Sequence, residues 1–304
     1  MRRCLFFLVM AGLWPTGVLG KGLELRLVSE YVEHLPGEAM YVKVSIKNIA
    51  DQPVILGQSP DWIRFLVYDS DLKPVARRGA VPTGDVFIVP ARQVTERFFK
   101  LGPYFDISEP GRYVIQTHVH VRAWKMNIQA NAVQVRVIRG VPVASLAQGI
   151  SDPLNPNQPP EIRKYTLVRK RNDGRIHLYL RVEEEMGKNV YGVLPLGGMV
   201  SFARPEFYLD KAGHAHALFQ NGSRNYLYCR VDPKGELLKR ETHEIYRGKR
   251  PVFGLNDQGD LEVNGGRRVD SPSDIPRTKR PRVRAIEPLP SRPGKRPTRV
   301  APLP

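Results

Sequence analysis

The sequence predicts an all-β protein. Short stretches in which apolar and polar residues alternate recur along the chain, and this period of two is typical of strands with one buried face. Turn-forming residues separate these stretches about every 8 to 12 residues, and no long helical pattern interrupts them. Hydrophobic residues make up 41% of the 304 residues, which is enough for a sizeable core.

The clearest strand pair lies in residues 35–56. Pro36 and Gly37 form a turn signal, because glycine adopts a positive φ without steric cost. After them an apolar residue occupies every second position, at Met40, Val42, Val44 and Ile46. Asn48 opens a polar turn, and a second apolar run follows at residues 54–56. This order predicts a strand, a turn and an antiparallel return strand.

Further strand candidates complete an N-terminal domain over residues 21–139. They are residues 23–28, 62–68, 94–101, 105–121, which begin with a turn, and 132–138. Turn residues close each run, as Gly102 and Pro103 do after the third. About seven short strands in roughly 120 residues is the pattern of an all-β sandwich.

This region resembles the immunoglobulin-like domains of exported bacterial envelope proteins. Residues 36–38, the alternating strand after them and Asn48 are similar to the second-strand region of such domains. Residues 106–113 resemble the turn in which a tyrosine hydroxyl, here that of Tyr113, binds back to the backbone. Trp62 would be the buried tryptophan. The resemblance covers about 115 residues and implies an immunoglobulin-like β-sandwich, but a fold carries no activity with it.

Residues 140–161 are predicted to be a Pro-rich linker. The segment contains five prolines. Proline lacks the N–H group that a central strand needs, so a run this rich in proline is typical of an extended connection between domains.

Residues 162–269 contain a weak repeat, which predicts a second β-rich module. Gly174, Gly213 and Gly259 each lie between two strand candidates, 39 and 46 residues apart. This spacing resembles that of the blades of exported β-propeller proteins. Only two to three units fit, whereas closed propellers typically have about four to eight. We therefore expect a partial, open β-sheet packed on the sandwich, with a ring completed by another chain as the alternative.

Residues 1–20 have the composition of a signal peptide. Arg2 and Arg3 precede a short apolar run, and small residues lie before a cleavage position after Gly20. The run is short for a membrane-spanning helix, although an uncleaved anchor is the alternative. The sequence therefore predicts an exported chain, periplasmic or extracellular, with no transmembrane helix after cleavage.

The cysteine content fits export in a bacterium. Cys4 lies in the predicted signal peptide, which leaves Cys229 as the single thiol and allows no intramolecular disulfide. Small domains of the eukaryotic secretory route are usually stapled by disulfides. Cys229 lies in a strand-like pattern, and we interpret it as a half-buried structural residue rather than a nucleophile.

Histidines supply the few candidate site residues. His118 and His120 lie on one face of a predicted strand, which the pattern indicates to be the solvated face. His177 and His216 occupy equivalent repeat positions, and repeat symmetry would place them in one channel as metal ligands. Structural histidines are the commoner outcome, so neither a metal nor a cofactor is predicted.

Catalytic motifs are absent from the sequence. It contains no Gly-x-Ser-x-Gly, no Walker loop, no His-Glu-x-x-His and no Cys-x-x-Cys. The sequence therefore predicts a protein that is not an enzyme. A metal-dependent hydrolase that uses His177 and His216 is the least favoured hypothesis.

Residues 270–304 are predicted to be a disordered, basic tail rich in Pro and Arg. This composition buries too little apolar area to offset the entropy of ordering the chain. The tail carries much of the net charge of +17, and such segments attract polyanions. It has no aromatic residue, so stacking on nucleic-acid bases is not supported. The residues expected to bind polyanions are Arg277, Lys279, Arg280, Arg282, Arg284, Arg292, Lys295, Arg296 and Arg299.

The favoured function is that of a non-catalytic binding or adaptor protein of the bacterial cell envelope. Its partner would be a protein or a glycan, contacted by loops or by an edge strand. The alternative is an electrostatic anchor that holds the folded part on a polyanionic surface through residues 270–304.

Overall fold

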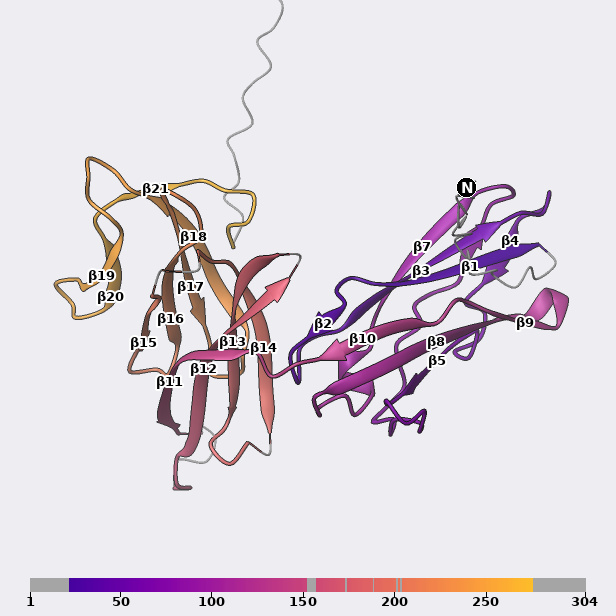
Figure 1. Ribbon diagram of the computed structural model, residues 1–304, viewed down its shortest axis with the longest axis horizontal. Helices are drawn as coiled ribbons and strands as arrows, with labels where there is room; N and C mark the ends of the chain where they lie inside the picture. Colours follow the sequence, from indigo (N-terminus) through magenta and orange to yellow (C-terminus); the bar gives the residue numbers. More distant parts are fainter. Residues whose placement is uncertain are drawn as a thin grey trace, which may run out of the picture.

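The computed structural model describes residues 22–151, 157–172, 174–187, 189–200, 202 and 204–275 (Figure 1). Within these ranges the chain forms strands β1 to β21 and two short 3-10 turns, so the predicted all-β fold class is confirmed. No helix in the described ranges is long and apolar enough to span a membrane. The predicted signal peptide and the predicted tail beyond residue 275 lie outside the described residues. The prediction of disorder is wrong for residues 270–275, because Asp274 is buried and the Ile275 backbone pairs with that of Arg240.

The N-terminal module, strands β1 to β10, consists of two sheets and a strand pair. The first sheet has the order β1 (Leu23–Ser29), β3 (Tyr41–Asn48) and β7 (Val94–Lys100). The second has the order β2 (Glu33–His34), β10 (Val133–Val137), β8 (Gly111–Val121) and β5 (Ile63–Tyr68), and β9 (Met126–Gln129) also pairs with β8. The separate pair is β4 (Val54–Leu56) with β6 (Phe87–Val89). The 3-10 turns are η1 (Gly102–Tyr104) and η2 (Arg122–Trp124).

One hydrophobic core fills the N-terminal module. The alternation predicted for residues 40–46 is confirmed, because the apolar positions are buried in this core. Trp62 is buried there as well. The Tyr113 hydroxyl donates a hydrogen bond to the Glu109 carbonyl at 2.8 Å, which fixes the turn before β8.

The C-terminal module, strands β11 to β21, packs two sheets against a second core. Apart from β21, each sheet is built from strands that are consecutive in the sequence. The first sheet contains β11 (Val141–Ile150), β12 (Glu161–Asn172), β13 (Arg175–Glu184) and β14 (Val190–Gly198). The second contains β15 (Glu206–Leu209), β16 (Ala215–Gln220), β17 (Asn225–Val231), β18 (Leu237–Glu244) and β21 (Arg267–Val269). A separate hairpin is formed by β19 (Val252–Leu255) and β20 (Leu261–Asn264).

The prediction of a linker over residues 140–161 is wrong for Val141–Ile150, which form β11 and pair with β12. The reason is the position of this strand. β11 lies at the edge of its sheet, where one side of the backbone needs no partner, and an edge strand tolerates the missing N–H of Pro142. The register also shifts between Pro142 and Ala144, so the ladder is interrupted next to the proline.

The glycines of the predicted repeat lie at equivalent hairpin turns. Gly174 joins β12 to β13, Gly213 joins β15 to β16, and Gly259 joins β19 to β20, with φ angles of +77°, +79° and +80°. Glycine adopts these angles without a Cβ penalty. Two of the turns are built alike, because the side chains of Asp210 and Asn256 each accept two backbone N–H groups. The repeat therefore corresponds to repeated hairpins, of which the last stays two-stranded.

The two modules are joined closely. β10 ends at Val137 and β11 begins at Val141. Gly140 between them has a φ of +68°, and a Cβ there would lie 2.5 Å from the Val168 side chain, so a larger residue does not fit. Figure 1 shows the modules side by side, with hairpin β19–β20 on the side away from the N-terminal module. A small hydrophobic cluster spans the junction and consists of Leu35, Val168, Tyr179 and Val193.

Candidate functional site

A cavity that gathers titratable side chains lies between the outer face of the β15–β18 sheet and hairpin β19–β20. We name it the hairpin cleft, and its volume is about 860 Å³. Strand alternation explains its floor. In β16 and β17 the residues of one parity fill the core, so the residues of the other parity face the hairpin. The floor residues are His216, Tyr228, Arg230, Lys239, Glu241 and His243.

Phe253 of β19 holds the hairpin on the sheet. Its ring centroid lies 5.5 Å from that of Tyr208 and 5.8 Å from that of Tyr228, both in edge-to-face geometry. The ring of His216 lies 6.4 Å away, also edge to face. The backbone N–H of Phe253 donates to Glu206 Oε2 at 2.8 Å. The hairpin is therefore attached by aromatic packing and by one hydrogen bond to a carboxylate.

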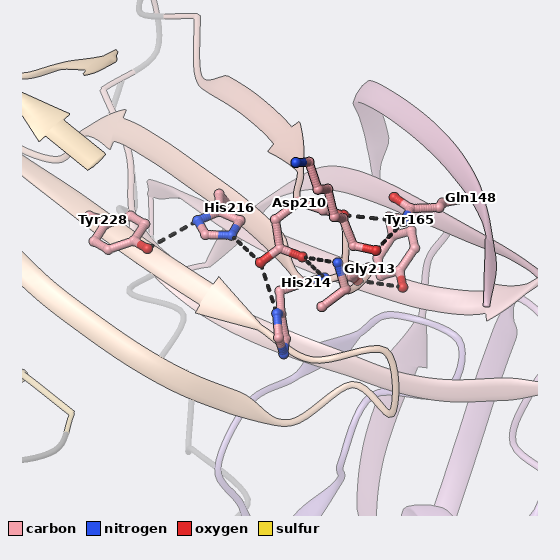
Figure 2. A network of polar contacts seen from close by, with 9 residues as sticks. Gln148, Tyr165, Asp210, Gly213, His214, His216 and Tyr228 are labelled. Carbon is pink, nitrogen blue, oxygen red and sulfur yellow. Dashed lines mark hydrogen bonds and ion pairs between the residues drawn. The ribbon is translucent and has the colours of Figure 1, made fainter. Parts of the chain in front are cut away.

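Asp210 organises the polar part of the cleft (Figure 2). Its Oδ1 accepts the backbone N–H groups of Ala212 and His214, each at 2.9 Å. Its Oδ2 accepts from His214 Nδ1 at 2.8 Å and from His216 Nε2 at 3.1 Å. His216 Nδ1 in turn lies 3.0 Å from the Tyr228 hydroxyl. The carboxylate thus joins a turn, two imidazoles and a phenol in one network.

Two side chains of the first sheet of the C-terminal module donate hydrogen bonds to the backbone of the Asp210 turn. Gln148 Nε2 of β11 donates to the Asp210 carbonyl at 3.2 Å, and the Tyr165 hydroxyl of β12 donates to the Gly213 carbonyl at 2.8 Å (Figure 2). Burial raises the pKa of Tyr165 to about 12, so its phenol remains a donor. The position of the network is therefore fixed by both sheets.

Charge and burial fix the protonation of the network. Burial opposes ionisation of Asp210, but the hydrogen bonds from His216, the backbone and His214 outweigh it and lower the pKa of Asp210 to about 2. Burial lowers the pKa of His216 although Asp210 acts in the opposite direction. Neutral His216 donates from Nε2 to the carboxylate, so its Nδ1 accepts the Tyr228 proton. Burial raises the pKa of Tyr228 to about 12, which keeps that proton in place.

A second charged group lies across the cleft floor on β18 and β21. Glu241 forms ion pairs with Lys239 Nζ and with Arg268 Nη1, each at 3.1 Å. His243 Nε2 lies 3.8 Å from Glu241, which is too long for a hydrogen bond. This nitrogen is buried and has no hydrogen-bond partner among the described residues. Burial lowers the pKa of His243, so the ring is neutral near pH 7.

The structure does not bring the two repeat histidines together, so the shared channel expected under the metal hypothesis is wrong. His216 faces the hairpin, on the outer face of the second sheet. His177 neighbours Leu178, whose side chain fills the core between the sheets, so His177 points from the outer face of the first sheet. The two histidines therefore lie on opposite sides of the C-terminal module. Among the described residues no group of three or more His, Cys, Asp or Glu has the arrangement of a metal site.

The other predicted positions lie apart from the cleft. His118 and His120 line a separate surface hollow of about 480 Å³, where His120 Nδ1 lies 2.8 Å from Asn127 Oδ1. Cys229 is fully buried in the core of the C-terminal module, and burial raises the pKa of its thiol to about 11. The nine basic tail residues from Arg277 to Arg299 lie outside the described residues.

Sequence reasoning missed most of the cleft residues. Asp210 lies in the turn after β15, Tyr228 on β17 and Glu241 on β18, so lateral strand pairing is needed to place them around one cleft. The turn sequence did contain a signal for this site. Asp210 precedes Gly213 by three residues, and His214 and His216 follow in alternation, so the Asp210 carboxylate lies beside both imidazole rings.

Comparisons with known proteins assign no family. No protein-family model matches the chain, and no curated protein matches it. Among solved structures, the chain is similar to Spo0M, a sporulation control protein from Bacillus subtilis, at 10% sequence identity. The similarity covers 59% of this chain and 91% of that chain, with a TM-score of 0.29. This TM-score is too low to support an argument about fold or function.

Proposed function

We propose that this protein is an exported, non-catalytic binding or adaptor protein of the bacterial cell envelope that holds a short glycan in the hairpin cleft. The observation that carries the proposal is the saturation of Asp210 and Glu241, the two carboxylates that the sheet side contributes to the cleft lining. Asp210 Oδ1 and Oδ2 accept four hydrogen bonds, and Glu241 is paired with Lys239 and Arg268. Neither Asp210 nor Glu241 is available to transfer a proton to a substrate, so the arrangement beside the cleft histidines favours binding over acid–base catalysis.

The composition of the cleft suits a polar ligand with apolar faces. The exposed Leu255 side chain provides apolar surface, the largely buried Tyr228 ring lines the floor, and Arg230 and Lys239 provide polar groups. Sugars combine apolar ring faces with hydroxyl groups. A pocket with aromatic surface and a few fixed polar groups is typical of small-ligand sites.

The scaffold supports a binding role without specifying it. An immunoglobulin-like N-terminal module and propeller-like hairpin repeats in the C-terminal module agree with the buried Trp62, the Tyr113 hydrogen bond and the recurring turns at Gly213 and Gly259. In such scaffolds the strands are rigid and the loops and outer faces make the contacts. The signal-peptide composition of residues 1–20 supports export.

A pair of matched variants tests the proposal. Leu255 at the cleft entrance and Val32 in the N-terminal module are equally exposed, at 66% and 67%. The full chain is immobilised and mixed with oligosaccharides released from bacterial envelope, and the retained sugars are identified by mass spectrometry. We expect wild type and Val32→Arg to retain the same sugars, and Leu255→Arg to lose at least tenfold of the retention. Absence of any retained sugar on wild type contradicts the glycan assignment.

The tail carries a second candidate function, a polyanion anchor. Residues 276–304 hold nine Lys or Arg residues against one Glu. Such a charge density favours binding to anionic lipid or cell-wall polymer with strong salt dependence. Deletion of residues 276–304 is expected to abolish sedimentation with anionic liposomes at low salt, while sugar retention in the cleft persists. Unchanged sedimentation after the deletion contradicts the anchor.

A further inference from the structure

We propose that β7 is a dimerisation strand, which pairs antiparallel with β7 of a second copy of this chain about a two-fold axis at Phe98. The proposal is independent of the hairpin cleft. It rests on the edges of the two sheets of the N-terminal module and on the side chains that β7 presents at its open edge.

The opposite edge of the same sheet is closed by a side chain. Asn131 reaches the edge strand β1, where its Oδ1 accepts the Leu27 N–H at 2.9 Å and its Nδ2 donates to the Leu27 carbonyl at 3.0 Å. The amide thus replaces a neighbouring strand at that point. In the second sheet the edge strand β5 is covered in part, because the Val75 N–H donates to the Val67 carbonyl at 2.8 Å. Covered edges resist pairing with another chain.

The outer edge of β7 has no such cover among the described residues. The Leu101 N–H donates to the Met40 carbonyl, so the odd-numbered positions of this strand direct their backbone groups toward β3. The even-numbered positions direct theirs outward. Their side chains lie on the solvent face of the sheet, and those of Val94 and Phe98 are 55% and 69% exposed. An unpaired backbone edge thus carries two large apolar side chains.

Charge and the overlap of the two β7 strands (Val94–Lys100) together select one register for self-pairing. With the axis at Phe98, the two Phe98 rings are opposite each other and Glu96 is opposite the partner's Lys100, twice by symmetry. An axis at Glu96, Arg97 or Lys100 places like charges directly opposite, which is destabilising. Phe98 also belongs to the outward-directed positions, so its backbone N–H and C=O form the hydrogen-bonded pair at the axis. On the inner face the same register places Arg97 opposite the partner's Phe99.

Sedimentation equilibrium of the full chain across the micromolar range tests the association. We expect a reversible dimer. Lys100→Glu places two like-charge pairs in the interface, and we expect it to raise the dimer Kd about tenfold, since like charges directly opposite each other are destabilising and the pair occurs twice. The exchanged variant E96K/K100E restores complementarity and should return the Kd to within about threefold of wild type. A chain that is monomeric throughout the range overturns the proposal.

Cysteine cross-linking tests the register. Cys229 is fully buried and unreactive, so the Cys4→Ser background leaves only an introduced thiol accessible. Phe98→Cys places two Cα atoms about 5.5 Å apart, within disulfide range. Val94→Cys places them about 27 Å apart in the same dimer. Rapid oxidation to a covalent dimer is expected for the first variant alone. Equal cross-linking of the two variants, or a faster reaction at position 94, overturns the register.

Discussion

The Lys170 ammonium lies 2.7 Å from Glu38 Oε2, and this ion pair joins the two modules. The side chains are 0% and 6% exposed, so water scarcely screens the pair. Lys170 also donates to the Glu33 carbonyl at 2.9 Å and lies 4.6 Å from the ring centroid of Tyr179. Burial lowers the pKa of Lys170, and the hydrogen bond to Glu38 opposes that shift. The junction therefore depends on a buried charge pair with a complete set of partners.

We expect Lys170→Met to lower the free energy of unfolding by about 3 to 5 kcal/mol, because Glu38 remains buried without a counter-ion. Urea denaturation measures the loss. Adding Glu38→Leu removes the orphaned charge, so the double variant should recover most of the stability. Lys43→Met is the matched control, because its partner Glu96 is solvent-exposed and the expected loss is below about 1 kcal/mol. Equal losses for the two lysine variants would show that burial of the pair is irrelevant.

Stability should fall as the pH drops below about 6.5. Burial lowers the pKa values of His34, His216 and His243, so these rings stay neutral in the folded chain. Below the unfolded pKa, the unfolded chain binds more protons than the folded chain, and stability is lost until the folded pKa is reached. The loss is about 1.4 kcal/mol for each unit by which a pKa is lowered. Urea midpoints at pH 7.5 and pH 5 measure it, and a pH-independent midpoint contradicts the expectation.

Asp210→Ala should destabilise the chain more than the equivalent substitution Asn256→Ala. Both side chains accept two backbone N–H groups in a hairpin turn of the same geometry, but only Asp210 also binds two histidines. We expect a loss of about 1 kcal/mol for Asn256→Ala and about 2 to 4 kcal/mol for Asp210→Ala, because hydrogen bonds to a charged group are stronger. The difference, obtained from urea denaturation, isolates the imidazole network. Equal losses would assign the whole effect to the turn.

Phe253→Ala should loosen the hairpin without unfolding the module. Each aromatic contact of Phe253 contributes about 0.5 to 1.5 kcal/mol beyond its buried area. We expect the backbone amides of β19 and β20 to exchange hydrogen about tenfold faster or more, while the amides of β12 keep the wild-type rate. Hydrogen exchange followed by mass spectrometry measures both. Faster exchange in β12 would instead indicate that Phe253 supports the core.

The features that could be predicted from the sequence are those that depend on local periodicity, namely strands, their buried faces and the hairpin turns. Alternation over residues 40–46 identified β3 and its buried face, and the turn glycines of the repeat marked three hairpins. The proline content predicted a linker where β11 forms. Whether such a segment becomes an edge strand depends on the neighbouring strand with which it pairs, here β12. That pairing is not visible in the strand's own residues.

The cleft and the module junction could not be predicted from local sequence patterns, because their contacts join residues that are far apart in the sequence. Lys170 and Glu38 are separated by 132 residues, and neither residue is unusual in its own segment. Their pairing follows from how the modules pack. Likewise, His177 and His216 are equivalent in the repeat, but the sheets turn their outer faces in opposite directions. Repeat position alone does not determine which face a side chain occupies in the assembled module.

The tight connection at Gly140 has a consequence for avidity. With the modules packed on each other at Gly140 and through the Lys170–Glu38 ion pair, two chains associated through β7 would display their hairpin clefts at a defined spacing and direction. A polymer with several copies of a ligand then binds the second cleft at a high effective concentration only where its repeat matches that spacing. The packed junction would in this way make the affinity of the dimer for a polymer depend on the spacing of the polymer's repeats.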